Sequence, residues 1–322
     1  VVLAAVVLAS GKKVERLLER LSWMMILFIF GFLLWVNFTF VPLNDWGSTL
    51  TGFFSFGVIP AKVDFVMLAV FAALAGSGGI GNLAISNWFR DKGFGMAART
   101  GNMGGVWSTE QTLAPVGRVF PINAENLRRW RDWWRYAMID QSGLWMLGCI
   151  VGMFLMVNLA SSLFQPGMQI SGVAAGVFQA AEMRKLWEGF WLLALMNGFW
   201  ILFSTTLTNI DVLARVIADM AWAGGAVPEK VPVGRLYGML LLGFTVIACF
   251  GAFLGDAKLL LTILGATAAP VNAFSALQIL RLNTTLLPVE LRPPLWRRIA
   301  LVLTALFYGA ISFAMFHQIF SR

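Results

Sequence analysis

Long runs of apolar residues alternate along this chain with short segments that carry most of its charge. A helix needs ~20 residues to cross a bilayer, and a helix satisfies its own backbone hydrogen bonds within lipid. The pattern predicts seven complete spans, at residues 21–42, 63–89, 143–165, 187–208, 236–254, 257–280 and 298–320. The apolar run at 1–10 is too short to span, and we expect it to be the end of a helix that begins before this sequence.

The composition supports this assignment. Hydrophobic residues make up 59% of the 322 positions and charged residues only 12%, against roughly 25% charged in ordinary soluble domains. The fold class predicted is an all-α polytopic membrane protein. The two cysteines lie inside apolar runs without metal-site spacing, and no cluster of His, Asp or Glu lies deep in a span. We therefore expect no enzyme activity and no cofactor.

The distribution of basic residues predicts the orientation. Of 24 Lys and Arg residues, 19 fall in alternate connecting segments, at 11–20, 90–142, 209–235 and 281–298. Cytoplasmic loops carry such an excess, so these segments are expected in the cytoplasm and the C-terminus outside. We expect an integral protein of a plasma membrane, most simply a bacterial inner membrane. The net charge of +8 is explained by the basic residues that orient the protein in the membrane. The lipid bilayer is therefore the predicted partner, and nucleic acid is not.

The long connector at 90–142 contains an amphipathic pattern. Tryptophans and arginines alternate through "NAENLRRWRDWWRYAMIDQ", and Asn123 is a suitable N-cap for a helix at about 124–138. Such a helix fits the headgroup region, where tryptophans enter the lipid and arginines meet anionic groups. A docking surface for nucleic acid or protein is the alternative interpretation of the same pattern.

The stretch "AGSGGIGN" at 75–82 contains the G-x-G-x-x-G spacing of dinucleotide-binding turns. That motif needs a preceding strand and an acidic residue ~20 positions later, and neither is predicted here. Glycine costs up to ~1 kcal/mol in a helix relative to alanine, so four glycines within six residues predict that the span at 63–89 is discontinuous. Unwound backbone in a membrane lines a cavity or is buried in protein. Close helix packing through small residues is the alternative.

A break of this kind is the usual substrate site of secondary transporters. The candidate substrate or ion ligands are Gly76, Ser77, Gly78, Gly79, Gly81 and Asn82, together with Asn272 in the proline-containing span at 257–280. The backbone carbonyls of Gly78 and Gly79 are the candidate metal ligands. Thr205, Asn209 and Asp211 are candidate gating or coupling residues. For Asp211, an ordinary ladder of ion pairs along one helix, formed with Arg215 and Asp219, is an equally good interpretation.

The segment 1–42, followed by the acidic connector "NDWG" and the interrupted span at 63–89, resembles the natural resistance-associated macrophage protein (Nramp) family of metal-ion transporters. The resemblance extends over nearly the whole chain. It implies a leucine-transporter-like inverted-repeat bundle, with metal bound at broken helices and commonly coupled to protons. Where the family has Met-Pro-His before Asn-Leu, this chain has Gly79, Ile80 and Gly81 before Asn82 and Leu83.

The missing Met and His change the expected substrate. Thioether ligands select transition metals, whereas carbonyl oxygens suit hard cations such as Mg²⁺ or Ca²⁺. The function predicted is therefore a secondary transporter of a divalent, hard metal cation. A transporter of a small organic solute with the same fold, and a membrane scaffold that transports nothing, are the alternatives.

Overall fold

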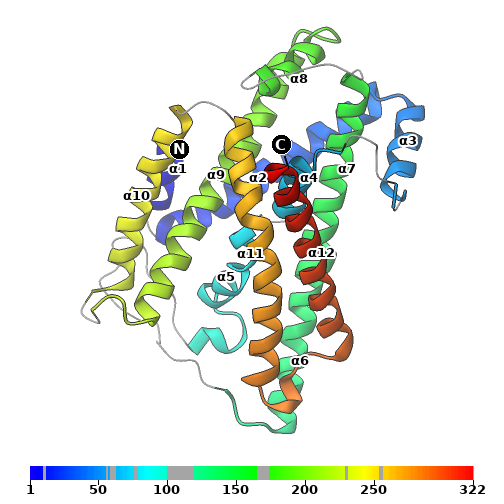
Figure 1. The fold of residues 1–322 in the computed structure, drawn as a ribbon. Coiled ribbons are helices and arrows are strands. Elements are labelled where there is room, and N and C mark those ends of the chain that lie inside the picture. Colours follow the sequence, from blue (N-terminus) through cyan, green and yellow to red (C-terminus); the bar gives the residue numbers. More distant parts are fainter. Residues whose placement is uncertain are drawn as a thin grey trace. The chain divides into compact units, whose positions relative to one another are not determined.

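The computed structural model describes residues 1–9, 12–55, 57–58, 63–75, 79–99, 119–164, 174–228, 231–253 and 257–321. All regular structure in these residues is helical, so the predicted all-α fold is confirmed for this part of the chain (Figure 1). The described residues contain six helices that are long and apolar enough to cross a membrane. The structure of these residues is therefore consistent with that of a polytopic membrane protein.

These helices follow the apolar runs of the sequence but often extend beyond them. The long helices are α2 (Lys12–Phe40), α7 (Met146–Leu163), α9 (Phe190–Ala223), α10 (Val233–Phe253), α11 (Ala257–Thr285) and α12 (Leu295–Phe320). Shorter helices are α1 (Val2–Ala9), α3 (Leu43–Phe53), α4 (Phe65–Leu74), α5 (Ile85–Asp91), α6 (Ala124–Met138) and α8 (Ala174–Arg184). Single turns of 3₁₀ helix lie at Gly79–Asn82 (η1), Gly95–Arg99 (η2) and Val289–Leu291 (η4).

Two helices extend beyond the spans predicted. The apolar span of α2 lies at Glu19–Phe40, close to the predicted 21–42, but the helix begins at Lys12 within the charged connector, whose Glu, Leu and Arg residues are good helix formers. The helix that contains the span predicted at 187–208 continues to Ala223. Asp211, Arg215 and Asp219 recur every four residues and therefore suit a continuing helix. Gly224 is the C-cap of this helix, and the next residue, Gly225, has a φ of 70° that glycine adopts without strain.

The chain divides into two compact units. The first lies within Val1–Val58, Phe89–Arg118 and Arg131–Gly255, and the second within Ile59–Trp88, Val119–Trp130 and Asp256–Arg322. In the first unit, α2, α7 and α9 share a core that includes Leu33, Val36, Leu159 and Phe190. The N-terminal helix α1 packs with α9 and α10 around a second core that includes Ala214 and Tyr237.

Buried asparagines connect α2 and α7 inside the first core. The Asn37 amide nitrogen donates to the carbonyl oxygens of Leu33 and Leu155, at 2.8 and 3.1 Å. The Asn158 amide nitrogen donates to Asn37 Oδ1 at 2.9 Å. Both side chains are completely buried. Polar contacts of this kind join helices where lipid offers no competing partner.

The second unit is built around α4, α11 and α12, which pack on one another in every pairwise combination. Along α4, Val66 and Ala69 contact Met315, while Ala73 contacts Ala268 and Ala269. Met315 and Tyr308 meet the beginning and end of α4 respectively, so α4 and α12 run antiparallel. With ten residues, α4 is ~15 Å long, about half the hydrocarbon thickness.

The amphipathic helix α6 occupies the range predicted for it. Asn123 Oδ1 accepts the backbone N–H of Asn126 at 2.8 Å, as an N-cap does. A π-helical segment at Ile139–Trp145 (η3) then joins α6 to α7, so that residues 124–163 form one uninterrupted helix.

Candidate functional site

The glycine-rich segment lies between two short helices. α4 ends at Leu74, and Ala75 leaves helical geometry with a ψ of 133°. Helical structure resumes as η1 at Gly79–Asn82, and α5 begins at Ile85. The predicted span at 63–89 is therefore not one continuous α-helix in the described residues. Gly76, Ser77 and Gly78 lie outside those residues.

Polar side chains hold both ends of α4 within the second unit. At the N-terminus, Asp64 Oδ1 accepts the backbone N–H groups of Val66 and Met67, and Gln318 Oε1 accepts that of Phe65 at 2.8 Å. At the C-terminus, the Tyr308 hydroxyl donates to the carbonyl oxygen of Ala72 at 3.0 Å. Because the terminal N–H and C=O groups of a helix lack intrahelical partners, these contacts stabilise α4 as an independent half-length helix.

Backbone contact holds α4 against α11. A Cβ atom on Gly265 would lie 2.5 Å from Val70 Cγ2 and 2.9 Å from Val70 Cα. Ala69, Ala73 and Ala269 are completely buried along the same packing region. Only small residues allow two helices in a membrane to approach this closely. The half-helix α4 therefore has a fixed position within its unit.

Asn272 is the predicted ligand that the structure places most clearly. It lies on α11 one turn beyond Ala268 and Ala269, which pack against Ala73 near the end of α4. The residue is only 9% exposed, and its side chain lies beside the Tyr308 hydroxyl, although among the described residues Nδ2 makes no hydrogen bond of standard geometry. A buried amide without such a bond costs about 1–3 kcal/mol unless a ligand or water satisfies it. Pro270 is accommodated inside α11 two residues earlier.

The remaining candidates of the break lie next to the helix that carries Asn272. η1, which contains Gly79, Gly81 and Asn82, packs against α11. Gly81 is buried and Asn82 is half-buried. The structure thus brings the described part of the predicted glycine site, the end of α4 and the Asn272 helix into one region of the second unit.

The candidate gating residues on α9 separate into two groups. Thr205 is exposed, and its hydroxyl donates to the Ile201 carbonyl of its own helix at 2.8 Å. Asn209 is also exposed. Asp211, by contrast, is only 8% exposed and belongs to a network of charges in the first unit.

That network connects the ends of α5, α9 and α10. Arg90 contacts Asp219 at 2.7 Å and Asp91 at 3.1 Å. Arg215 contacts Asp91 at 2.6 Å and Asp211 at 2.9 Å. The Tyr237 hydroxyl donates to Asp211 at 2.7 Å, and the Arg215 guanidinium lies 5.3 Å from the centre of the Tyr237 ring. Sequence reasoning identified the three α9 charges as a ladder but missed the other three residues.

The network fixes the C-terminal end of α5 to α9. The five side chains that form its ion pairs are at most 21% exposed, so water screens these charges only partly. Burial lowers the pKa of Arg90, but the hydrogen bond to Asp219 and the charges of Asp91 and Asp219 raise it by more. The network therefore stabilises the packing of Arg90 and Asp91 on α9 within the first unit.

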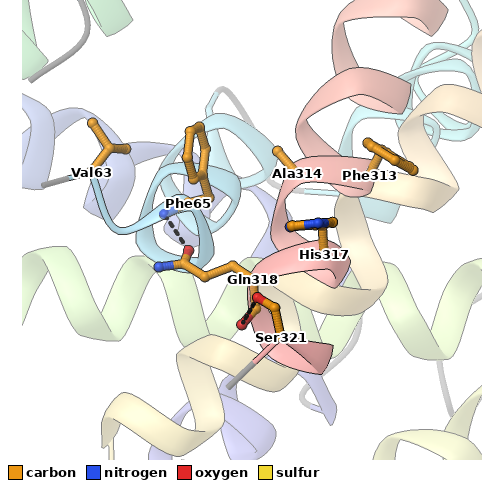
Figure 2. Close-up of a pocket in the computed structure, with 7 residues that line it drawn as sticks. All are labelled: Val63, Phe65, Phe313, Ala314, His317, Gln318 and Ser321. Atoms are coloured by element: carbon orange, nitrogen blue, oxygen red, sulfur yellow. Dashed lines mark hydrogen bonds between the residues drawn. The ribbon is translucent and has the colours of Figure 1, made fainter. Parts of the chain in front are cut away.

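A separate hollow lies at the N-terminal end of α4, away from the break (Figure 2). Its lining is largely apolar and includes Phe65, Phe313 and Ala314, with His317 and Gln318 as polar members. The only histidine of the chain lies here and is exposed. The described residues contain no group of three or more His, Cys, Asp or Glu side chains arranged to hold a metal ion.

The chain matches no protein-family model, and comparisons with curated proteins and with solved structures also gave no match. The fold and the six long apolar helices are those expected of a helical integral membrane protein.

Proposed function

We propose that this protein is a secondary transporter, similar to the Nramp family, which moves a divalent metal cation through a site at the end of α4. The observation that carries the proposal is the half-length helix α4, which stops at Leu74 near the buried side chain of Asn272. In transporters, discontinuous helices present free backbone groups to the substrate near the middle of the membrane.

The chemistry of this region favours a cation. The C-terminal end of a helix carries partial negative charge and unpaired carbonyl oxygens. An asparagine amide contributes a further oxygen ligand when its orientation suits the ligand. Hard cations prefer such oxygen ligands. The resemblance to the Nramp family adds proton coupling to the proposal.

Reconstitution of the full chain into liposomes tests the proposal. We expect saturable uptake of Mg²⁺, Ca²⁺ or Mn²⁺, followed with an internal metal-sensitive dye, and acidification of the lumen if protons accompany the metal. The Asn272→Ala variant should raise KM about tenfold or more, because a ligand to a charged species contributes about 1.5–3 kcal/mol. Asn44→Ala is the matched control, since Asn44 is exposed on α3 and has no role in the proposed site, and should behave like the wild type.

A small organic solute is the second candidate, supported by the buried Asn272 amide, which can donate as well as accept. Uptake of amino acids in the same liposomes, without uptake of any metal, would replace the cation proposal with this one. Absence of both activities would favour a scaffold and contradict transport.

A further inference from the structure

In the last turn of α4, the carbonyl oxygen of Ala72 has a side-chain partner. Tyr308 on α12 donates its hydroxyl hydrogen to Ala72 O at 3.0 Å, whereas the backbone N–H of Ala75 approaches the same oxygen only to 3.4 Å. The final four carbonyls of a helix have no intrahelical donor. The tyrosine therefore provides the better hydrogen bond to this carbonyl.

The tyrosine itself is held in place. Tyr308 packs against the cluster formed by Ala73, Ala268 and Ala269, which lie on the two helices that meet at the end of α4. Ten residues further along α12, Gln318 accepts the backbone N–H of Phe65 at the opposite end of α4. One helix thus contacts the terminal backbone groups at both ends of α4.

We propose that Tyr308 is a positioning residue for the substrate site. Its hydroxyl holds the Ala72 carbonyl in one direction. This hydrogen bond orients the last turn of α4, so that the carbonyl groups after Ala72 face the substrate. This inference rests on the proposed function, because it assigns Tyr308 a role at the same site. Tyr308 contacts the helix end through Ala72 O, and its hydroxyl also lies beside the side chain of Asn272, so it positions both groups without being a ligand itself.

The Tyr308→Phe variant removes the hydroxyl and retains the ring that packs on the alanines. In liposomes that contain the full chain, we expect the KM for Mg²⁺ to rise about threefold to tenfold, which corresponds to one hydrogen bond. The maximal rate per folded transporter should stay within about twofold, because the ring packing is unchanged. Tyr136→Phe is the control, since Tyr136 is 53% exposed, and should leave both constants unchanged.

A second measurement does not depend on transport or on the variant. The chain contains only three tyrosines, so growth with 3-fluorotyrosine gives a simple fluorine NMR spectrum of the purified protein. Addition of Mg²⁺ should shift the resonance of Tyr308, because its hydroxyl is bonded to the turn that meets the ion. The resonance of Tyr136 should not move.

The possible outcomes separate the two proposals. If the wild type takes up none of Mg²⁺, Ca²⁺ and Mn²⁺, the proposed function fails. If the wild type transports Mg²⁺ and Tyr308→Phe lowers only the yield or the maximal rate, the tyrosine has a merely structural role and the positioning proposal is overturned. A Tyr308 fluorine resonance that does not respond to saturating Mg²⁺ in a transporting protein also overturns it.

Discussion

Arg90 in α5 donates a hydrogen bond from Nη1 to Oδ2 of Asp219 in α9 at 2.7 Å, across 129 positions of the chain. The contact is one end of a series of alternating charges that continues through Asp91, Arg215 and Asp211. Ionisable groups at the ends of membrane helices are favoured where they pair with one another. We therefore expect the loss of one charge from this series to lower the stability of the fold more than the loss of an exposed ion pair.

Replacing Arg215 with methionine should destabilise the protein strongly. Arg215 lies between Asp91 and Asp211, and all three side chains are less than 20% exposed. Removal of one partner from a buried ion pair leaves an uncompensated charge and costs about 3–5 kcal/mol. We expect a large fall in the thermal unfolding midpoint of the purified protein in detergent.

Arg129→Met is the matched control for this change. Arg129 pairs with Glu125, and both side chains are more than 60% exposed. An exposed pair contributes at most about 1 kcal/mol, so the midpoint should hardly move. Equal midpoints for the two variants would show that the buried series does not stabilise the fold.

The charge series also shows where prediction from the sequence ends. The recurrence of Asp211, Arg215 and Asp219 every four residues predicts a local ladder, and the contact between Arg215 and Asp211 has that spacing. Arg90 and Asp91 follow the glycine-rich segment and resemble ordinary loop charges. Nothing in the local pattern shows that they meet α9, because that pairing depends on how distant helices pack.

The limits of the helices were harder to predict than their existence, because they also depend on contacts outside each segment. The apolar runs predicted the long helices well, because hydrophobic length is a property of each segment alone. The connector was predicted to end at residue 142 and the span to begin at residue 143, yet the chain stays helical across this point as η3. The interruption between α4 and α5 was predicted from glycine content, since the conformational cost of glycine is local.

Gly265→Ala should weaken the packing of α4 on α11. The new Cβ would lie 2.5 Å from Val70 Cγ2 and 2.9 Å from Val70 Cα, and a change of side-chain rotamer cannot relieve the second contact. Overpacking of this kind costs about 1–3 kcal/mol. A lower unfolding midpoint is expected, with only partial recovery in the Gly265→Ala, Val70→Ala double variant.

Gly309→Ala on α12 controls for the effect of alanine on helix propensity. A Cβ on Gly309 meets no atom within 4 Å, so the change should be neutral or stabilising by up to ~1 kcal/mol. If Gly265→Ala also proves neutral, then α4 and α11 do not approach each other as closely as the structure indicates.

The Asn37–Asn158 contact predicts non-additive mutations. Asn158→Leu alone leaves Asn37 Oδ1 buried without its donor, and Asn37→Leu alone removes the acceptor of Asn158. Hydrogen bonds between membrane helices contribute about 0.6 kcal/mol on average and up to about 1.7 kcal/mol. The double leucine variant should lose less stability than the sum of the two single variants. Strict additivity in the unfolding measurements would contradict a direct coupling.

The distribution of basic residues predicts a C-terminus outside the cytoplasm. Four alternate segments hold 19 of the 24 Lys and Arg residues, and the excess marks the cytoplasmic side. An alkaline phosphatase fused after residue 322 should be active in bacterial cells, and a green fluorescent protein fused there should be dark. The reverse pattern would invert the proposed orientation.

The continuous helix from Ala124 to Leu163 predicts that α6 stands out from the bilayer. Forty residues make a helix ~60 Å long, about twice the hydrocarbon thickness of ~30 Å. Exposed apolar side chains such as Leu144 and Leu147 fit lipid contact, whereas no residue of α6 is buried. Nitroxide labels at position 128 should therefore be accessible to a water-soluble relaxation agent, and labels at position 147 to oxygen dissolved in lipid.

The interfacial arrangement gives a different pattern of accessibility. A helix lying among the headgroups would place Trp130 and Trp134 in lipid and Arg128 and Arg135 in water, so that oxygen accessibility would vary with a helical period along 124–138. A projecting α6 places all of these positions in water or against protein, with low oxygen accessibility throughout the helix. Because both sets of labels are read in the same reconstituted protein, a single scan from position 124 to position 150 decides between the two arrangements.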